Sequence, residues 1–298
     1  MSAFMVRKAN LLHDTKSILG EGPVWDYRAQ RLFWVDIEGY GLHQYDPSTE
    51  KYETWHFDEM IGAAVPAEDG KLLLAMEKGL ALFDMKTAEV SRLRILENSD
   101  DHIRFNDGKI GPDGAFWIGT MDKNCAPKAG NLFRVTPALQ TSLQVSDTSI
   151  SNGLAWTSDY KIFYYIDSAS YSIQAFDFNL KNGTITNGKT IVKVPETYGS
   201  PDGMCIDEED MLWVAHWGGN CVRRWNPKTG AVLATIEVPA PHVTSCCFGG
   251  KHLNTLYITT ARSGLTPEQH KAFPKSGGLF STELDVKGTP IHYFNPES

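Results

Sequence analysis

The chain has 298 residues, of which 42% are apolar and 21% charged, a globular composition that excludes wholesale disorder. It carries 28 Lys and Arg against 36 Asp and Glu, a net charge of −8, and no long basic run, which argues against a nucleic-acid partner. No apolar run approaches the roughly 18 residues that a membrane span needs, and residues 1–17 lack the apolar core of a secretory signal.

The five cysteines are an odd number, and two of them, Cys246 and Cys247, are adjacent. No Cys-x-x-Cys pair occurs, which argues for a reducing compartment and against a disulfide framework or a structural zinc site. We therefore expect a cytoplasmic protein. Nothing in the sequence indicates a nucleic acid, a membrane or an obligate protein as its partner.

A short sequence pattern, in which a turn is followed by a run of aromatic or aliphatic residues, recurs along the chain. The central residues of the runs are separated by gaps of 40, 43, 48, 48 and 44 residues. In chain order they are Trp34, Leu74, Trp117, Tyr165, Trp213 and Tyr257. Similar gaps of this length are typical of a propeller built from four-stranded blades.

A second strand of similar character is expected after each of these runs. The segments are residues 41–47, 79–84, 130–135, 172–177, 221–226 and 277–281. The repeats predict an all-β fold, a six-bladed β-propeller of four-stranded blades that forms a single domain over residues 1–298. A strand near residues 7–12 is expected to close the ring on the last blade, because closure removes open sheet edges. Two stacked β-sandwiches are the alternative, but they do not predict a recurring spacing.

A third run precedes each central residue and is predicted to be the innermost strand of its blade. Its first residue lies 11 or 13 positions before the central residue in every repeat. These first residues are Glu21, Ile61, Asn106, Asn152, Asp202 and Thr244. Because equivalent positions in a propeller face the mouth of the same channel, we expect the four that are carboxylates or amides to converge there.

Two carboxylates and two amides aimed at one point indicate a cation, because like charges repel unless something positive lies between them. Oxygen ligands with open water positions suit calcium, and also magnesium or manganese; zinc is possible but prefers His or Cys. We expect one divalent metal ion. The alternative is that Asn-Gly and Asp-Gly are only turn signals, although Glu21 is not a turn former.

The same segments carry a family resemblance that covers essentially the whole chain. They include Gly-Glu-Gly-Pro-Val-Trp at 20–25, Arg-Phe-Asn-Asp-Gly-Lys at 104–109, Ser-Asn-Gly-Leu-Ala-Trp at 151–156 and Pro-Asp-Gly-Met-Cys-Ile-Asp at 201–207. On these segments the chain resembles the senescence-marker-protein/gluconolactonase (regucalcin-like) family. The resemblance implies a six-bladed propeller with one catalytic divalent metal that hydrolyses sugar lactones.

The resemblance also implies roles for single residues. Glu21, Asn152 and Asp202 correspond to the metal ligands, and Arg104 and Asn106 to residues that bind the substrate.

One segment departs from the family pattern, in which two acidic residues follow shortly after Gly-Thr-Met. Here residues 119–124 read Gly-Thr-Met-Asp-Lys-Asn. The acid that would contact the sugar hydroxyls is therefore either displaced to Asp122 or replaced by Asn124. This change affects the expected substrate preference and leaves the expected metal site intact. The polar loop at residues 122–130 is expected to form a rim over the site.

The expected reaction opens a cyclic ester, an aldono-lactone, to the sugar acid. A divalent metal would act as a Lewis acid on the lactone carbonyl. Asp202 is the expected general base toward a water that is either bound to the metal or beside it. Two alternatives remain: another metal-dependent esterase or phosphotriesterase on the same scaffold, and a non-catalytic calcium-binding propeller.

Overall fold

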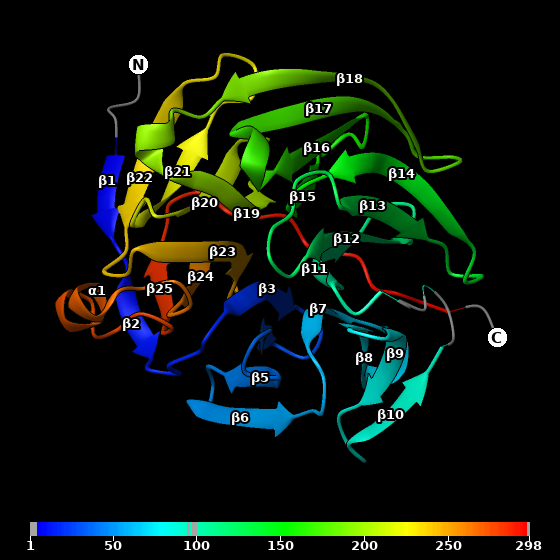
Figure 1. The fold of residues 1–298 in the computed structure, drawn as a ribbon, viewed down its shortest axis with the longest axis horizontal. Coiled ribbons are helices and arrows are strands. Elements are labelled where there is room, and N and C mark those ends of the chain that lie inside the picture. Colours follow the sequence, from blue (N-terminus) through cyan, green and yellow to red (C-terminus); the bar gives the residue numbers. More distant parts are fainter. Residues whose placement is uncertain (1–4, 94–95, 97–99, 297–298) are drawn as a thin grey trace.

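A computed structural model describes residues 5–93, 96 and 100–296. The strands of this part of the chain form six blades arranged in a ring around a central channel (Figure 1). Within each blade, neighbouring strands are antiparallel, and the innermost strand lies beside the channel. The predicted six-bladed propeller is confirmed.

The first three blades are built from strands that follow one another in the chain. They are β3 (Gly20–Asp26), β4 (Arg31–Asp36), β5 (Gly41–Asp46) and β6 (Lys51–His56); β7 (Ile61–Pro66), β8 (Lys71–Met76), β9 (Gly79–Asp84) and β10 (Glu89–Arg92); and β11 (Ile103–Ile110), β12 (Phe116–Asp122), β13 (Gly130–Val135) and β14 (Thr141–Thr148).

The fourth and fifth blades have the same order, and the sixth takes its outermost strand from the other end of the chain. They are β15 (Ser151–Trp156), β16 (Ile162–Asp167), β17 (Ser172–Asn179) and β18 (Thr184–Lys193); β19 (Ser200–Ile206), β20 (Leu212–Trp217), β21 (Cys221–Trp225) and β22 (Val232–Glu237); and β23 (His242–Gly249), β24 (Thr255–Ala261), β25 (Leu279–Glu283) and β2 (Asn10–His13).

The closure of the ring corrects the sequence prediction in one detail. Strand β2 pairs with β25 of the sixth blade, as expected. Arg7 instead lies in β1 (Met5–Lys8), which pairs in parallel with β22 of the fifth blade. The chain changes blades at Ala9, whose N–H still donates to Glu237 O at 2.9 Å, so one short N-terminal segment covers two outer edges.

Helical structure is sparse in the described residues. The α-helix α1 (Pro267–Ala272) begins with a capping box, in which Thr266 and Gln269 bond to each other's backbone N–H. Three 3₁₀ turns are η1 (Glu68–Gly70), η2 (Ser168–Ser170) and η3 (Glu196–Tyr198). No helix of this part of the chain has the length and apolar character to cross a membrane.

The residues at the centre of the sequence repeat form the core of the blades. Each lies on the second strand of its blade, and none has more than 4% of its surface exposed. They pack with apolar residues of adjacent blades, which is why the repeat places an aromatic or a leucine there.

Every innermost strand contains a bulge close to the residue that begins its sequence motif. The register shifts lie at Glu21/Val24, Ile61/Ala63, Phe105/Gly108, Asn152/Leu154, Pro201/Met204 and Val243/Ser245. A bulge re-aims side chains and often lies next to a functional site. The repeat therefore places six bulges, one in each innermost strand, at the same end of the channel.

The Asn-Gly and Asp-Gly pairs of these strands are not turns. Asn152 and Gly153 lie in β15, and Asp202 and Gly203 lie in β19. A Cβ on Gly153 would lie 2.8 Å from the carbonyl oxygen of Asp202, so glycine is required where two innermost strands approach each other. The turn alternative for these residues is therefore wrong.

Candidate functional site

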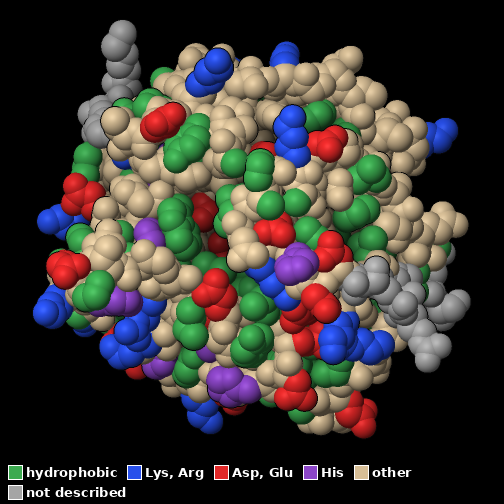
Figure 2. Space-filling view, in the orientation of Figure 1, with side chains coloured by type: hydrophobic (Ala, Val, Ile, Leu, Met, Phe, Trp, Pro, Cys, Tyr) green, Lys and Arg blue, Asp and Glu red, His purple; other side chains and the backbone are tan. Residues whose placement is uncertain are grey.

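The candidate residues lie at the channel end where the innermost strands begin. Glu21, Asn152 and Asp202 occupy the first half of β3, β15 and β19, and Arg104 and Asn106 lie in β11. Figure 2 looks onto this end and shows acidic side chains bordering a hollow near the middle of the face. We call it the front end of the channel.

A chain of hydrogen bonds joins the predicted substrate residues to one predicted metal ligand. Arg104 Nη1 donates to Asn106 Oδ1 at 2.6 Å. Asn106 Nδ2 donates to Asn152 Oδ1 at 3.1 Å and to the carbonyl of Ser151 at 2.8 Å. Asn152 Nδ2 donates to Ser168 Oγ at 2.9 Å. These bonds fix the orientation of both amides, and the Asn152 oxygen keeps a second lone pair.

The two carboxylates at the front end are both buried. Glu21 and Asp202 each expose 6% of their surface. Burial and then the charge of Asp107 raise the pKa of Glu21, and the Gly22 N–H and Arg104 lower it; the net result is a pKa of about 8. Burial and then the charges of Glu21 and Asp107 raise the pKa of Asp202 well above its usual range. Both carboxylates therefore resist ionisation unless positive charge is added.

One oxygen of the pair lacks any partner in the described part of the chain. Asp202 Oδ1 is buried without a hydrogen bond, whereas Glu21 Oε2 accepts from the N–H of Gly22 at 2.9 Å. A buried carboxylate oxygen without a donor is costly unless it faces a cation or water.

Arg104 is the cation that the front end already contains. It exposes 7% of its surface, and burial lowers its pKa. The charges of Glu21, Glu38 and Asp202 act in the opposite direction and favour its ionised form. One guanidinium thus interacts with three carboxylates, so negative charge is left over when all four groups are ionised.

Asp107 is a buried acidic residue that the sequence argument missed. It exposes 4% of its surface, and burial raises its pKa, whereas Lys109 lowers it. Lys109 Nζ donates to the carbonyls of Leu154, at 3.0 Å, and Met204, and so connects β11 with β15 and β19. In the sequence, Asp107 sits in an Asn-Asp-Gly run typical of a turn, and only its place beside Asn106 could have indicated burial.

The residues at the front end fit a divalent cation by the chemistry of their donors. Two facing carboxylates, one with an unpartnered oxygen, and the amide oxygen of Asn152 form a set of hard oxygen donors. The described residues contain no group of three or more His, Cys, Asp or Glu side chains placed to hold a metal. Among the three candidate ligands, only Glu21 and Asp202 are of these types, and the third donor is the amide of Asn152. An amide donor is unfavourable for zinc.

The two remaining repeat positions carry no candidate ligand, as expected. Ile61 is fully buried in the core. Thr244 Oγ1 donates to the carbonyl of Gly20 at 2.5 Å and to Thr259 Oγ1 at 2.9 Å. Thr244 therefore holds the beginning of β3, one residue before Glu21.

Asp122 and Asn124 are not joined to the other candidates by any hydrogen bond shown among the described residues. Asp122 Oδ1 accepts from the backbone N–H of Asn124 at 2.7 Å and of Ala126 at 3.3 Å, which orders the rim loop. Asn124 is exposed. A role of either side chain toward a substrate stays a prediction.

Comparison with known proteins gives a consistent result. A model of the SMP-30/Gluconolactonase/LRE-like region matches residues 19–262. Regucalcin of Oryctolagus cuniculus is 38% identical over 281 residues, which cover 92% of this chain and 94% of the relative. The "Putative sugar lactone lactonase YvrE" of Bacillus subtilis is 35% identical over 277 residues, covering 92% of this chain and 94% of the relative. The crystal structure of a calcium-binding protein, regucalcin, from Agrobacterium tumefaciens has a TM-score of 0.93, with 27% identity and 99% coverage of both chains.

Proposed function

The chain belongs to the SMP-30/gluconolactonase/LRE-like family, and we propose that it is a divalent-metal-dependent hydrolase that opens sugar lactones to sugar acids. The observation that carries this proposal is the pair of buried carboxylates at the front end, Glu21 and Asp202, whose charges a single guanidinium leaves unbalanced. The sugar lactone lactonase name of the Bacillus relative and the calcium-binding description of the Agrobacterium one both support it.

Glu21, Asn152 and Asp202 would hold the ion, and calcium suits the donor set best. A divalent cation at this position would polarise the lactone carbonyl and stabilise the negative charge that develops on its oxygen. Thr244 and Ser168 support the ligands through their hydrogen bonds, the first at the start of β3 and the second at Asn152.

Arg104 and Asn106 would orient the sugar. Their mutual hydrogen bond and the contact of Asn106 with Asn152 keep both side chains in place before a substrate arrives. Preorganised donors of this kind hold the reacting carbon near the attacking water without loss of side-chain freedom during binding. The rim loop, with Asp122 and Asn124, would contribute to the choice of sugar.

Asp202 would act as the general base through the carboxylate oxygen that does not bind the ion. It takes a proton from the water as the water oxygen bonds to the lactone carbonyl carbon. When the ring C–O bond breaks, the same group returns the proton to the ring oxygen, which leaves as a hydroxyl. The product is the open sugar acid, and Asp202 is ionised again.

Two other functions share this geometry. The same oxygen donors around a cation could serve another ester or a phosphotriester, because fold and metal do not by themselves select the substrate. A calcium-binding propeller without catalysis is the second, and the calcium-binding description of the Agrobacterium protein is compatible with it as well.

A pH-stat assay distinguishes the three functions. Purified protein is given aldono-lactones, simple aliphatic esters and a phosphotriester, each with calcium, zinc, magnesium or manganese after chelator treatment. We expect metal-dependent acid release from an aldono-lactone, at a higher rate than from the other substrates. Preference for the phosphotriester, or calcium binding without turnover of any substrate, would replace the proposal by one of the alternatives.

The variant Asp202→Asn tests the assigned base. At saturating metal it should lose roughly 100-fold or more in kcat, the usual range for a general acid–base group. Asp285→Asn is the matched control, since Asp285 is exposed and pairs with Arg7 at the outer edge of the ring. Near-normal turnover of Asp202→Asn at full metal occupancy would exclude Asp202 as the base.

A further inference from the structure

The loop between β4 and β5, residues 37–40, lies at the front end of the channel. Strand β3 begins at the front and pairs antiparallel with β4, whose last residue, Asp36, lies opposite Gly20. The loop that follows Asp36 therefore starts beside the first residues of β3, where Glu21 is placed. Glu38 belongs to this loop and is partly exposed.

The backbone on both sides of Glu38 is held by hydrogen bonds. Asp36 Oδ1 accepts from the N–H of Gly39 at 3.0 Å and from that of Leu19 at 2.8 Å. Ile37 N donates to the carbonyl of Leu19 at 2.9 Å, and the Ile37 side chain is fully buried in the core. Glu38 thus projects from a fixed part of the fold, so its backbone needs no ordering when a ligand binds.

The Glu38 side chain points toward the channel axis. Glu38 lies in the first blade, whereas Arg104 lies in β11 of the third blade, beyond the second. The charge of Glu38 nevertheless favours the ionised form of Arg104, and among the side chains that do so only Glu21 has a larger effect. A carboxylate that pointed outward from the first blade would be too far from Arg104 to have this effect. Glu38 and Arg104 therefore face each other across the mouth of the channel.

The Glu38 carboxylate has no partner of its own. It makes no hydrogen bond and no ion pair with any residue that the structure describes, Arg104 included. Glu77 is a useful contrast, because it directly follows β8 in the second blade and pairs with Lys123. Glu38 thus keeps its acceptor oxygens free at the front end.

Arg104 keeps donors free on the other side of the mouth. Its Nη1 donates to the carbonyl of Phe105 at 3.0 Å and to Asn106 Oδ1 at 2.6 Å, and its other nitrogens make no hydrogen bond with the described residues. A guanidinium has five N–H donors. Free donors of Arg104 and free acceptors of Glu38 therefore lie at the same end of the channel, and their charges interact although the groups do not bond to each other.

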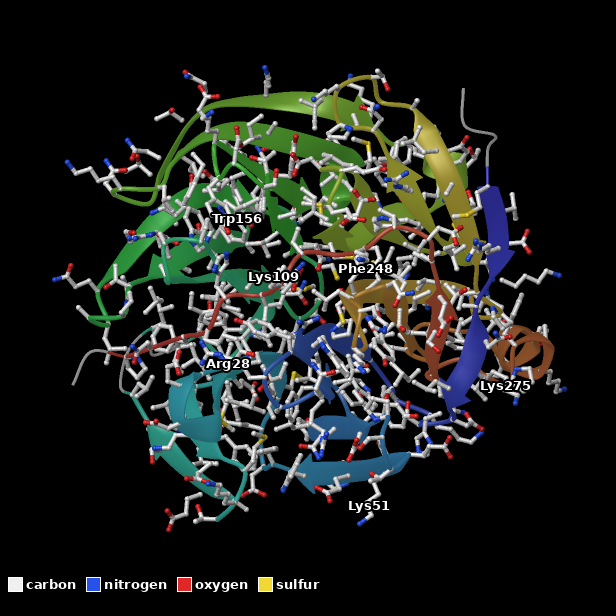
Figure 3. The ribbon with its side chains drawn as sticks, turned by 180° about the vertical axis from the view of Figure 1, so that it is seen from behind. Arg28, Lys51, Lys109, Trp156, Phe248 and Lys275 are labelled. Atoms are coloured by element: carbon white, nitrogen blue, oxygen red, sulfur yellow. The ribbon has the colours of Figure 1, made fainter. Side chains whose placement is uncertain are left out.

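The front is also the end from which a ligand reaches these groups. In Figure 3, which views the ring from behind, the C-terminal segment, residues 284–296, crosses the centre of the ring close to the labelled Lys109. Phe294 N donates to the carbonyl of Pro66 at 3.0 Å, and the Phe294 side chain is fully buried, so the segment is fixed to the ring there. The segment covers the end opposite to the front, whereas the hollow of Figure 2 lies at the front itself.

We propose that Glu38 binds hydroxyl groups of the sugar and so selects polyhydroxylated lactones over plain cyclic esters. This inference rests on the proposed lactonase function and names the feature of the substrate that the front end recognises. A sugar hydroxyl both donates and accepts, so one hydroxyl donates to the Glu38 carboxylate while a neighbouring one accepts from the Arg104 guanidinium. A lactone without hydroxyls can make neither bond.

Two lactones with the same ring size test the proposal in steady-state kinetics. They are D-glucono-1,5-lactone and δ-valerolactone, which has the same ring without hydroxyl groups. Glu38→Gln should lower kcat/KM for gluconolactone about 10- to 30-fold, mainly through KM, and should change that for δ-valerolactone less than about twofold. Glu53→Gln is the matched control, since Glu53 is exposed on the outer strand β6 of the same blade. An equal loss for both lactones would mean that Glu38 only adjusts the charge of Arg104 and would overturn the proposal, as would no loss for either.

A polyol that cannot be hydrolysed separates this inference from the lactonase function. 1,5-Anhydro-D-glucitol has the ring and hydroxyls of gluconolactone but no carbonyl, and an NMR titration measures its affinity. We expect Glu38→Gln to bind it at least about tenfold more weakly than the unmodified chain or Glu53→Gln. Bound polyol should also slow the alkylation of Cys125 at least about threefold, because Cys125 is exposed in the rim loop and its charge acts on Arg104.

The outcomes of the two experiments are distinguishable. Polyol binding that depends on Glu38, in a chain that hydrolyses no lactone, would overturn the lactonase function and support the hydroxyl-binding role of Glu38. Lactone hydrolysis with the same preference for hydroxylated lactones in Glu38→Gln as in the unmodified chain would overturn the role of Glu38 and leave the lactonase function intact. A chain that neither hydrolyses a lactone nor binds the polyol would contradict both.

Discussion

The two ends of the channel balance their buried charges in different ways. At the end opposite to the front, which we call the back end, the charge of Lys109 lowers the pKa of Asp107. The Lys109 ammonium also donates hydrogen bonds to two carbonyls. At the front, Glu21 and Asp202 share the single guanidinium of Arg104. Asp107 also raises the pKa of both front carboxylates, so an excess of negative charge remains at the front, which a further positive charge would balance. The difference supports the proposal that a metal ion binds at the front end, although both ends contain buried carboxylates.

The largest effect is expected from removal of one front carboxylate. Glu21→Gln deletes a full charge at nearly constant shape, which is worth about 4 kcal/mol toward a nearby cation and hence roughly 1,000-fold in affinity. Calorimetric titration with calcium measures it. Glu77→Gln is the control, because Glu77 pairs with Lys123 in a partly exposed position. Equal calcium affinity of Glu21→Gln and the unmodified chain would remove Glu21 from the ligand set.

The next largest effect is a loss of stability when Lys109, beside Asp107 at the back end of the channel, is replaced. Lys109→Met leaves the carbonyls of Leu154 and Met204 without their donor and Asp107 without its cation. Breaking such a buried arrangement should lower the free energy of unfolding by about 3 kcal/mol. Denaturant unfolding measures it against Lys161→Met, whose lysine is 78% exposed at the surface. If the two variants were equally stable, Lys109 would not be the internal counter-ion of the back end.

A smaller effect separates substrate binding from metal binding within the front end. Arg104→Ala should lower kcat/KM for the lactone roughly 10- to 100-fold, because the sugar is less well oriented. The calcium affinity should stay the same or rise, since a positive charge has been removed next to the ion. Steady-state kinetics and calcium titration of the same preparation test both parts. Loss of the ion together with activity would contradict the separate roles.

A further effect is a dependence of stability on pH in the metal-free protein. The pKa of Glu21 is about 8 in the fold and lies near 4.5 without it, so the folded state binds more protons between these values. Stability should therefore fall as pH rises from about 5 to 8, and the Tm should drop by several degrees. Added calcium should reverse the drop, and Glu21→Gln should reduce it. A Tm in chelator that rises over this range would have the wrong sign.

The fold and the front end could be predicted because both follow from the repeat. Trp34, Trp117 and Trp213 recur at blade spacing, and the same spacing aligns Glu21, Asn152 and Asp202 at the bulged end of their strands. Equivalent positions of a closed ring meet at its axis, so sequence period alone brings distant residues together.

The back end could not be predicted, because no repeat contains it. Asp107 and Lys109 are specific to one blade, and their burial depends on carbonyls of β15 and β19. The C-terminal segment, residues 284–296, has no strand periodicity, and its path is set by hydrogen bonds to the carbonyls of Leu253 and Pro66. The partner of β1 escaped prediction for the same reason, since nothing near Arg7 indicates which outer edge it joins.

The most direct test of the front-end metal site is anomalous X-ray scattering from crystals of the protein soaked in manganese. The expected result is a single strong peak within about 2.5 Å of oxygens of Glu21, Asn152 and Asp202. No peak at these residues, or a peak beside Asp107 at the back end instead, would contradict the distinction between the two ends of the channel.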